Sequence, residues 1–391
     1  MNKPKLIRIT TVPISFKVLL KGQHRFMSDN GFEVVGISSN GEEIQSLEQD
    51  ENVRFITVKM TRTISPFQDL KSVWQLYKIF KKEKPLIVHT HTPKAGTTGM
   101  IAAKLAGVPI RLHTVAGLPL MEAKGLRRII LNWVEKITYA CSIKVYPNSQ
   151  GLYDFILKNK YTTKDKLKVI GQGSSNGIDT SYFNSKSISN EQKQALKNSL
   201  GITPEDFVFI FVGRLVGDKG INELVAAFSQ ICKTENKTNC KLLLVGWLET
   251  ELDSLSSNTL KNIEAHPNII SVGFQKDVRP YYAISDALIF PSYREGFPNV
   301  VMQAGAMELP SIVTNINGCN EIIIDNKNGI IIPVKNISAV KTAMEKLMSD
   351  KIFYKKLKEN SREMIVSRYE QSVIWNALLE EYKRMIQEKN V

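Results

Sequence analysis

The stretch Phe290-Pro-Ser-Tyr-Arg-Glu-Gly-Phe-Pro-Asn-Val-Val-Met-Gln-Ala304 shows the structural unit from which this chain is built. It begins where a short apolar run, Ala287–Phe290, ends, and such a run is typical of a buried strand. Pro298 stands where a helical pattern starts, and proline is tolerated there because the first helical N–H has no partner. We therefore expect a strand, a turn and a helix in direct succession.

The same succession repeats along the chain, and this alternation indicates parallel sheets covered by helices. The predicted strands are Leu6–Thr10, Glu33–Ser38, Leu86–His89, Ile110–Thr114, Ile143–Pro147, Val208–Val212, Lys241–Val245, Ile269–Val272, Ala287–Phe290, Ser311–Thr314 and Gly329–Ile332. The predicted helices include Phe16–Asn30, Asp69–Glu83, Gly96–Ala106, Leu126–Ala140 and Val373–Glu388. We expect an α/β fold with doubly wound parallel sheets, whose ligands bind beyond the carboxyl ends of the strands.

The length of 391 residues favours two domains. The turn-rich segment Gly171–Gly177 and the polar segment Ser185–Gln194 interrupt the alternation, so we place the interdomain connection there. The prediction is a first domain at residues 1–185, a second at 186–372, and a last helical segment, 373–391, that crosses back to the first domain.

The composition is that of a globular protein, with 43% hydrophobic and 23% charged residues. No apolar stretch approaches the roughly 20 residues that span a bilayer, and the first residues lack a secretory apolar segment. The four cysteines are scattered, which argues against a disulfide framework or a zinc site. We therefore expect a cytoplasmic protein.

The net charge of +14 lies entirely in the first half of the chain. Residues 1–190 contain 28 Lys and Arg against 14 Asp and Glu, whereas residues 191–391 contain 24 of each. Basic amphipathic stretches at Lys124–Tyr139 and Val73–Lys84 favour contact with an anionic membrane surface. The alternatives are a merely solvated basic face and, for the two helices, ordinary core packing; nucleic-acid binding is disfavoured because no recognition motif accompanies the charge.

The loop Phe211-Val-Gly-Arg-Leu-Val-Gly-Asp-Lys-Gly220 follows a predicted strand and places two cations at a strand-to-helix turn. Gly213 lets backbone approach a ligand closely, and Arg214 and Lys219 suit a diphosphate. A solvated basic turn is the alternative. The glycine and lysine spacing does not match the loop of nucleotide-hydrolysing enzymes.

The helix end at Pro298 is a second anion site in this prediction. The free N–H groups of Asn299, Val300 and Val301 would point out of an end that carries partial positive charge. Glu295, just before it, is placed to accept hydrogen bonds from sugar hydroxyls, although a purely capping role is the alternative. A phosphate and a sugar bound side by side would explain both features.

These motifs together resemble the donor site of glycosyltransferase family 4, which includes transferases that build capsular and other surface polysaccharides. The resemblance covers essentially the whole chain. It implies the GT-B fold, with two facing Rossmann-like domains, and a retaining reaction. It also implies that Arg214 and Lys219 hold the donor diphosphate and stabilise the leaving charge, and that Glu295 binds the donor sugar.

One departure from the family pattern is Gln303, which stands where the family usually has a glutamate that holds the ribose hydroxyls. An amide still hydrogen-bonds a hydroxyl but carries no charge. The predicted donor-binding residues are Gly213, Gly246, Gly273, Phe274, Gly296, Phe297, Pro298, Asn299, Val300 and Gln303, with the catalytic roles assigned to Arg214, Lys219 and Glu295.

The acceptor is expected in the first domain. The segment Val88-His-Thr-His-Thr-Pro-Lys-Ala-Gly96 contains two histidines whose spacing permits a metal site, a polar cleft lining or a structural role. By the resemblance, His91 and Lys94 face the acceptor cleft. His113 precedes the next loop, but Ala116 occupies the slot where many relatives have a histidine, so no catalytic histidine is assigned. Lys21 is a weaker candidate for contact with donor phosphate or acceptor.

The chain lacks an Asp-x-Asp motif, so we expect neither a metal nor another cofactor. The predicted function is a metal-independent, retaining hexosyltransferase that uses a nucleoside diphosphate sugar, for which we expect UDP. Its acceptor would be a glycan or a polyprenyl-diphosphate-linked glycan at the inner face of the cell membrane. Two alternatives remain: a degenerate transferase that acts as a scaffold, suggested by Ala116 and Gln303, and a sugar-nucleotide epimerase on the same fold.

Overall fold

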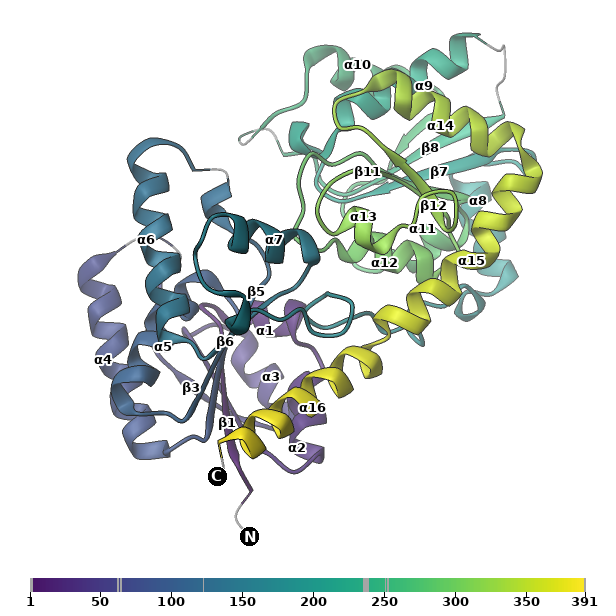
Figure 1. The fold of residues 1–391 in the computed structure, drawn as a ribbon. Helices are drawn as coiled ribbons and strands as arrows, with labels where there is room; N and C mark the ends of the chain where they lie inside the picture. Colours follow the sequence, from purple (N-terminus) through teal and green to yellow (C-terminus); the bar gives the residue numbers. More distant parts are fainter. Residues whose placement is uncertain are drawn as a thin grey trace. The chain divides into compact units, whose positions relative to one another are not determined.

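The structure is a computed structural model that describes residues 3–61, 63, 65–121, 123–234, 239–249, 251 and 253–389. The chain divides into two compact units, Met1–Gly177 together with Gln371–Val391, and Ile178–Glu370 (Figure 1). Each unit contains a six-stranded sheet in which every strand pair is parallel, so the predicted doubly wound α/β architecture is confirmed.

The sheet of the first unit has the strand order β3-β2-β1-β4-β5-β6. Its strands are β1 (Lys5–Ile9), β2 (Glu33–Ser38), β3 (Arg54–Thr57), β4 (Ile87–Thr90), β5 (Ile110–Val115) and β6 (Lys144–Pro147). Its helices are α1 (Pro13–Leu19), α2 (Gln23–Asp29), α3 (Glu43–Glu51), α4 (Pro66–Glu83), α5 (Pro93–Ala106), η1 (Pro119–Met121), α6 (Gly125–Cys141), α7 (Gln150–Lys158), η2 (Lys164–Lys166) and α16 (Gln371–Glu388).

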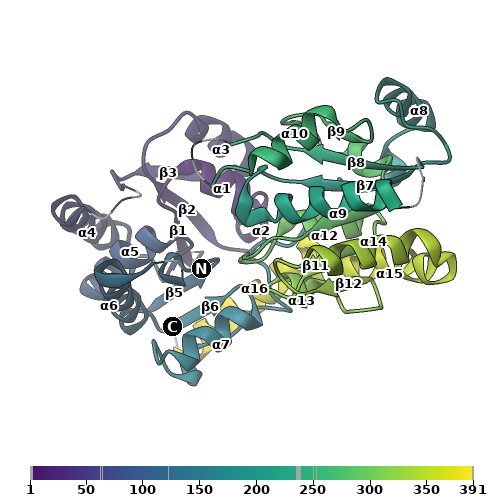
Figure 2. The same cartoon turned by 90° about the horizontal axis from the view of Figure 1, so that it is seen from above.

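Helices cover both faces of this sheet because side chains alternate across each strand. Leu6 packs in one core cluster with residues of α1, α2, α3 and α16, whereas Ile7 and Ile9 pack on the opposite face with residues of α4 and α5. Figure 2 shows these helices flanking the sheet. A sheet buried on both faces explains why its strands read as nearly continuous apolar runs.

The sheet of the second unit has the strand order β12-β11-β10-β7-β8-β9. Its strands are β7 (Phe207–Val212), β8 (Cys240–Val245), β9 (Ile269–Ser271), β10 (Ala287–Phe290), β11 (Ser311–Thr314) and β12 (Gly329–Ile332). Its helices are η3 (Ser185–Ser187), α8 (Asn190–Ser199), η4 (Gly217–Lys219), α9 (Ile221–Thr234), α10 (Ser257–Ala265), α11 (Arg279–Ala283), α12 (Asn299–Ala306), α13 (Cys319–Ile322), α14 (Ile337–Ser349) and α15 (Lys351–Tyr369).

Two expectations about the first unit are wrong. The single helix predicted at Phe16–Asn30 is two helices, because Gly22 adopts a left-handed φ of 80° at the start of α2 and interrupts the helical hydrogen bonding. The edge strand β3 was not predicted, because its four residues, Arg54–Thr57, are too short and too mixed in polarity to show a strand pattern.

The unit boundaries lie elsewhere than the predicted domain limits of 185/186 and 372/373. Ile178 forms a parallel bridge with Glu370, and its N–H donates to the carbonyl of Tyr369 at 2.8 Å. This pairing keeps residues 178–185 with the second unit. Beyond it, Leu378 and Tyr382 of α16 are buried in the core of the first unit.

Candidate functional site

In the second unit, the loops that follow β7 and β10 are bound to each other at the carboxyl edge of the sheet. The N–H of Tyr293 donates to the carbonyl of Asp218 at 2.8 Å, and Arg294 Nη2 lies 2.8 Å from Asp218 Oδ2. Gly220 has a φ of +71°, and a Cβ there would lie 2.2 Å from the carbonyl oxygen of Pro291. Only glycine fits this position, so the two predicted motifs meet because of their own residues.

Lys219 and Glu295 form an ion pair between these loops. Each side chain is only 17% exposed. The hydroxyl of Ser292 also donates to Glu295 Oε1, at 3.0 Å. The ammonium group that the sequence assigns to a diphosphate therefore lies directly beside the carboxylate that it assigns to a sugar.

A third loop, which follows β11, supports this pair and was missed by the sequence reasoning. Asn317 Nδ2 donates to the backbone carbonyl of Gly296 at 2.6 Å, and the hydroxyl of Thr314 donates to the carbonyl of Ser292. The signal in the sequence was a polar run, Thr314-Asn-Ile-Asn-Gly318, directly after a buried strand. These bonds hold the backbone on both sides of Glu295.

The helix that begins after this segment is α12; Pro298 is its N-cap, one residue before the first helical position at which it was predicted. Among the described residues, no side chain caps this end. One detail of the prediction is wrong: the N–H of Val301 bonds to the carbonyl of Pro298 at 3.2 Å, so it does not point freely outward. Asn299 is exposed, Val300 is partly exposed, and Phe297 packs edge-on against Tyr369 with ring centroids 5.4 Å apart.

Arg214 is nearly half exposed and lies at the same sheet edge but in a different ion pair. Its Nη1 lies 2.7 Å from Glu249 Oε2 in the loop after β8. That loop approaches Gly213 very closely, because a Cβ at Gly246 would lie 1.8 Å from the carbonyl oxygen of Gly213. Within the described ranges, no hydrogen bond or ion pair joins Arg214 to Lys219 or Glu295.

Two exposed aromatic rings lie where the loops after β8 and β9 begin. Trp247 follows Gly246, Phe274 follows Gly273, and the rings stack with centroids 4.9 Å apart. They are 52% and 62% exposed, which is unusual for side chains of this size. Gly246, Gly273 and Phe274 were among the predicted donor-binding residues, whereas Trp247 was not singled out.

Gln303, the departure from the family pattern, lies on α12 and is partly buried. Its Oε1 accepts a hydrogen bond from the hydroxyl of Tyr282 at 3.3 Å. Burial raises the pKa of that hydroxyl, so Tyr282 remains a donor at neutral pH. The amide therefore presents its NH₂ group, rather than a second acceptor oxygen, to any further partner.

The residues predicted for the acceptor side all lie in the first unit, but their environments differ from one another. His91 is buried and lines a small pocket at the carboxyl edge of the sheet. Lys94 binds Asp69 at 2.6 Å and thereby links α5 to α4. Lys21 is exposed, and its backbone carbonyl accepts from Asn176 Nδ2 at 3.0 Å. His113 is buried against α5, where Thr90 Oγ1 contacts its Nδ1 at 2.8 Å.

The buried histidines of the first unit are neutral. Burial lowers the pKa of His91 well below its ordinary value and lowers the pKa of His113 to about 4. His89 joins α16 to the sheet, because its Nδ1 lies 2.6 Å from the hydroxyl of Tyr382. In the part of the chain that the structure describes, no cluster of three or more His, Cys, Asp or Glu side chains has metal-binding geometry.

Comparison with known proteins agrees with the geometry in both units. Residues 192–364 match the family described as "Glycosyl transferases group 1", and residues 9–149 match "Glycosyl transferase 4-like". The chain is 34% identical to a capsular polysaccharide biosynthesis glycosyltransferase, CapM, from Staphylococcus aureus, and the alignment covers 99% of each chain. It is 30% identical, over 82% of its length and 81% of the relative, to an Escherichia coli UDP-Gal:alpha-D-GlcNAc-diphosphoundecaprenol alpha-1,3-galactosyltransferase.

Solved structures of the GT-B type share the fold. A glycosyltransferase from Rickettsia africae superimposes with a TM-score of 0.81 at 21% identity, over 99% of both chains. The Anabaena protein HepE, crystallised with UDP, superimposes with a TM-score of 0.81 at 17% identity, over 98% of this chain and 100% of that one. The Lys219–Glu295 pair, this fold and these relatives lead to one conclusion: the chain belongs to the group 1 glycosyltransferases, of the family 4 type.

Proposed function

We propose that the chain transfers a hexosyl group, with retention, from a UDP-sugar to a polyprenyl-diphosphate-linked glycan. The observation that carries the donor half of this proposal is the Lys219–Glu295 pair beside the uncapped end of α12. The E. coli relative named above uses UDP-galactose and a diphosphoundecaprenol acceptor, and HepE was crystallised with UDP. Capsule synthesis by the S. aureus relative is consistent with a surface-glycan product.

The chemistry requires a group that stabilises the charge of the departing nucleotide. Lys219 supplies a cation that is largely withdrawn from water, where a preorganised charge is worth more than in solvent. The exposed start of α12 offers backbone N–H groups to the same phosphates. Glu295, held by Ser292, is placed to orient the sugar hydroxyls. We propose that these groups make transfer independent of metal ions.

Nucleotide recognition is assigned to the remaining residues at this sheet edge. The stacked rings of Trp247 and Phe274 offer an aromatic surface to a base. The NH₂ group of Gln303 is available to a ribose hydroxyl. Arg214, at the start of the loop, would exchange Glu249 for a phosphate oxygen. Such an exchange needs little energy because both partners of this pair are accessible to water.

The direct test is transfer by the purified full-length chain, assayed with a panel of UDP-hexoses and UDP-N-acetylhexosamines. The acceptor is a short-chain prenyl diphosphate that bears one N-acetylhexosamine, and EDTA is present throughout. We expect one donor to give a product with the anomeric configuration of the donor. Absence of transfer with every donor, or inversion in the product, would refute the proposal. Conversion of the donor sugar without acceptor would instead support an epimerase.

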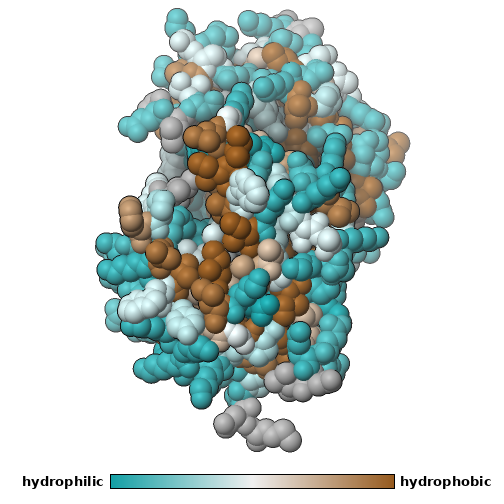
Figure 3. All heavy atoms as spheres, turned by 60° about the vertical axis from the view of Figure 1, so that its left-hand side comes forward, coloured by the Kyte–Doolittle hydropathy of each residue, from teal (hydrophilic) through white to brown (hydrophobic). Residues whose placement is uncertain are grey.

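An exposed apolar surface in the first unit supports the proposal of a lipid-linked acceptor at a membrane. Large apolar side chains are exposed along α4 and α6, and Figure 3 shows hydrophobic residues gathered on this side of the molecule. The exposed residues are Phe67 (93%), Leu70 (70%) and Trp74 (56%) on α4, and Leu126 (72%), Ile129 (54%), Ile130 (40%), Trp133 (64%) and Ile137 (44%) on α6. Exposure of this many large side chains is a marker of an interaction surface.

The charges on the same helices favour an anionic bilayer as the partner. Lys71, Lys78, Arg127 and Lys136 are exposed on α4 and α6. Lys78 Nζ lies 3.3 Å from the ring centroid of Trp74, so a cation lies over an exposed aromatic ring. Apolar side chains flanked by lysine and arginine are typical of helices that lie in a bilayer interface. None of the described helices is long and apolar enough to cross the membrane.

Vesicle sedimentation tests this surface. The Leu126→Ser/Trp133→Ser protein should bind vesicles of anionic phospholipid at least tenfold more weakly than the unmodified chain, because two large apolar groups no longer enter the interface. The matched control is Ile352→Ser/Trp247→Ser, which removes an 86% and a 52% exposed residue from the second unit. Equal loss of binding in both variants would refute the assignment, as would equal binding to zwitterionic vesicles.

A further inference from the structure

Arg8, on β1 of the first unit, is completely buried. No carboxylate lies within 4 Å of its guanidinium in the described ranges, although a buried charge is normally paired. Burial lowers the pKa of Arg8, but an arginine stays charged in proteins. The sequence reasoning did not single out this residue, because it lies in an otherwise ordinary strand.

The polar contacts of Arg8 satisfy only part of its guanidinium. Its Nε donates to His91 Nε2 at 3.1 Å, and its Nη2 donates to Gln23 Oε1. Its Nη1 is buried without any hydrogen-bond partner in the structure. Leaving a charged donor unsatisfied in the interior is costly, so this atom indicates a missing acceptor.

His91 supplies a second unsatisfied donor. Because its Nε2 accepts from Arg8, the single hydrogen of the neutral ring must lie on Nδ1. Among the residues that the structure describes, that Nδ1 is buried and has no hydrogen-bond partner. In the same described part of the chain, Ser175 Oγ is buried without a hydrogen-bond partner. Three donors in one region therefore lack an acceptor.

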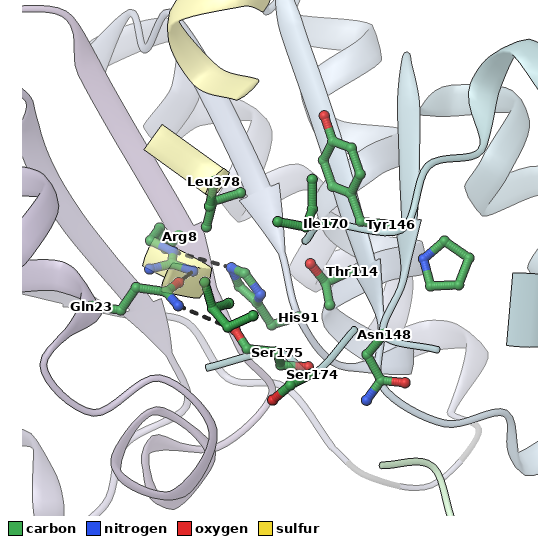
Figure 4. A pocket seen from close by; sticks show the side chains of 12 residues that line it. Arg8, Gln23, His91, Thr114, Tyr146, Asn148, Ile170, Ser174, Ser175 and Leu378 are labelled. Carbon is green, nitrogen blue, oxygen red and sulfur yellow. Dashed lines mark hydrogen bonds between the residues drawn. The ribbon is translucent and has the colours of Figure 1, made fainter. Parts of the chain in front are cut away.

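These residues line one pocket at the carboxyl edge of the sheet, shown in Figure 4. The pocket also contacts Thr114 at the end of β5 and Asn148 just after β6. Its volume is about 20 Å³, which is room for one water-sized group. The carboxyl edge is where doubly wound sheets bind their ligands.

We propose that this pocket is a subsite for a single phosphoryl oxygen, bound by Arg8, His91 and Ser175. The inference deepens the proposed function, because the diphosphate of the lipid-linked acceptor would supply that oxygen. The small volume admits one oxygen and leaves the rest of the phosphate outside. An anionic oxygen accepts several hydrogen bonds and also offsets the charge of Arg8, whereas a water molecule offsets no charge.

Calorimetry with inorganic pyrophosphate tests the subsite in the full-length chain. A Lys219→Met background removes the contribution of the donor site in the second unit. In that background, Arg8→Gln should weaken pyrophosphate binding at least tenfold, and Arg8→Lys should restore part of the loss. The matched control is Arg111→Gln, which removes another desolvated arginine of the same sheet, one whose donors already reach the carbonyls of Cys141 and Val108. Equal binding by the Arg8→Gln and Arg111→Gln proteins would overturn the proposal.

Two further measurements keep the proposal testable. In crystals of the unmodified chain soaked with pyrophosphate, we expect an oxygen within hydrogen-bond distance of Arg8 Nη1; a water molecule alone at that position would overturn the proposal even if the Arg8 variants do not fold. In transfer assays, Arg8→Gln should raise the KM for the acceptor at least tenfold and leave the KM for the donor unchanged. If pyrophosphate binding depends on Arg8 but no sugar is transferred to any acceptor, the proposed function is refuted and the phosphoryl subsite still stands.

Discussion

The two units build the same sheet and use its carboxyl edge differently. Counted from the first strand of each unit, both sheets have the order 3-2-1-4-5-6. In the second unit, both cations at this edge have a carboxylate partner: the half-exposed Arg214 pairs with Glu249, and the mostly buried Lys219 pairs with Glu295. In the first unit, the cation is Arg8, which is buried and has neutral partners only.

With this difference, one scaffold can serve two kinds of anion. A cation that already has a carboxylate partner can exchange it for a phosphate and recover it afterwards, most easily at the exposed Arg214–Glu249 pair. This suits a donor nucleotide that must leave after each turnover. Arg8 hydrogen-bonds two neutral groups, and Glu51 acts on its charge only electrostatically, so its guanidinium stays partly unsatisfied until an anion arrives. It therefore suits an acceptor group that must be selected and positioned.

The largest expected effect concerns the accessible edge. Lys219→Met should lower kcat/KM for transfer by about 10²–10³-fold, because a preorganised charge at the leaving diphosphate is lost. Lys346→Met, a change to an exposed lysine of α14, serves as the control and should leave kcat/KM unchanged. Steady-state kinetics with saturating acceptor gives both values. A loss below threefold for Lys219→Met would mean that this lysine does not hold the diphosphate.

The next prediction concerns a buried carboxyl group of the first unit that forms no ion pair among the described residues. Glu135 of α6 is buried, and this burial raises its pKa from 4.5 to about 7. The folded state therefore binds this proton more tightly than the unfolded chain does. The contribution of this proton to the free energy of unfolding is fully present below pH 4.5. It is lost as the pH rises through about 7, which lowers the free energy of unfolding by up to about 3 kcal/mol.

Glu135→Gln should remove this pH dependence. Thermal unfolding at pH 5 and pH 8 should show a gain in Tm relative to the unmodified chain that is larger at pH 8. Glu380→Gln is the control, because that carboxylate is exposed on α16 and pairs with the exposed Lys383. A Glu135→Gln gain in Tm that is the same at both pH values would contradict the assigned titration.

The smallest expected effect concerns Gln303. In the Gln303→Glu protein, the hydroxyl of Tyr282 would still donate to the side chain, and the second carboxylate oxygen would accept from a ribose hydroxyl. The KM for the donor should fall about two- to tenfold, since one charge-assisted hydrogen bond replaces a neutral one. If the KM rises instead, the NH₂ group of Gln303 is itself required, and the chain uses this position differently from its relatives.

Much of the fold follows from the sequence because parallel strands buried on both faces read as apolar runs. β7, for example, is Phe-Val-Phe-Ile-Phe-Val and was predicted to within one residue. The break at Gly22 and the edge strand β3 were missed, because a single glycine inside an amphipathic run and four mixed residues at a sheet edge leave little periodic signal.

The positions of candidate site residues could be predicted where a motif contains the residues that fix its local structure. Gly220 and Pro298 bring Lys219, Glu295 and the start of α12 to one edge of the sheet. The partners of Arg214 and Gln303 were not predictable, because Glu249 and Tyr282 are distant in sequence and belong to no motif. Arg8 was missed for a different reason: its burial and its unpartnered Nη1 depend on neighbours that are distant in sequence, and a sequence does not show them.

UDP binding measured by calorimetry, in the presence of EDTA, tests most directly the claim that the accessible edge of the second unit holds the donor diphosphate. We expect the unmodified chain and the Arg8→Gln protein to bind UDP equally, and the Lys219→Met protein to bind UDP at least tenfold more weakly. If the Lys219→Met protein binds UDP as tightly as the unmodified chain, or if only the Arg8→Gln protein binds it more weakly, the donor diphosphate is not held at this edge.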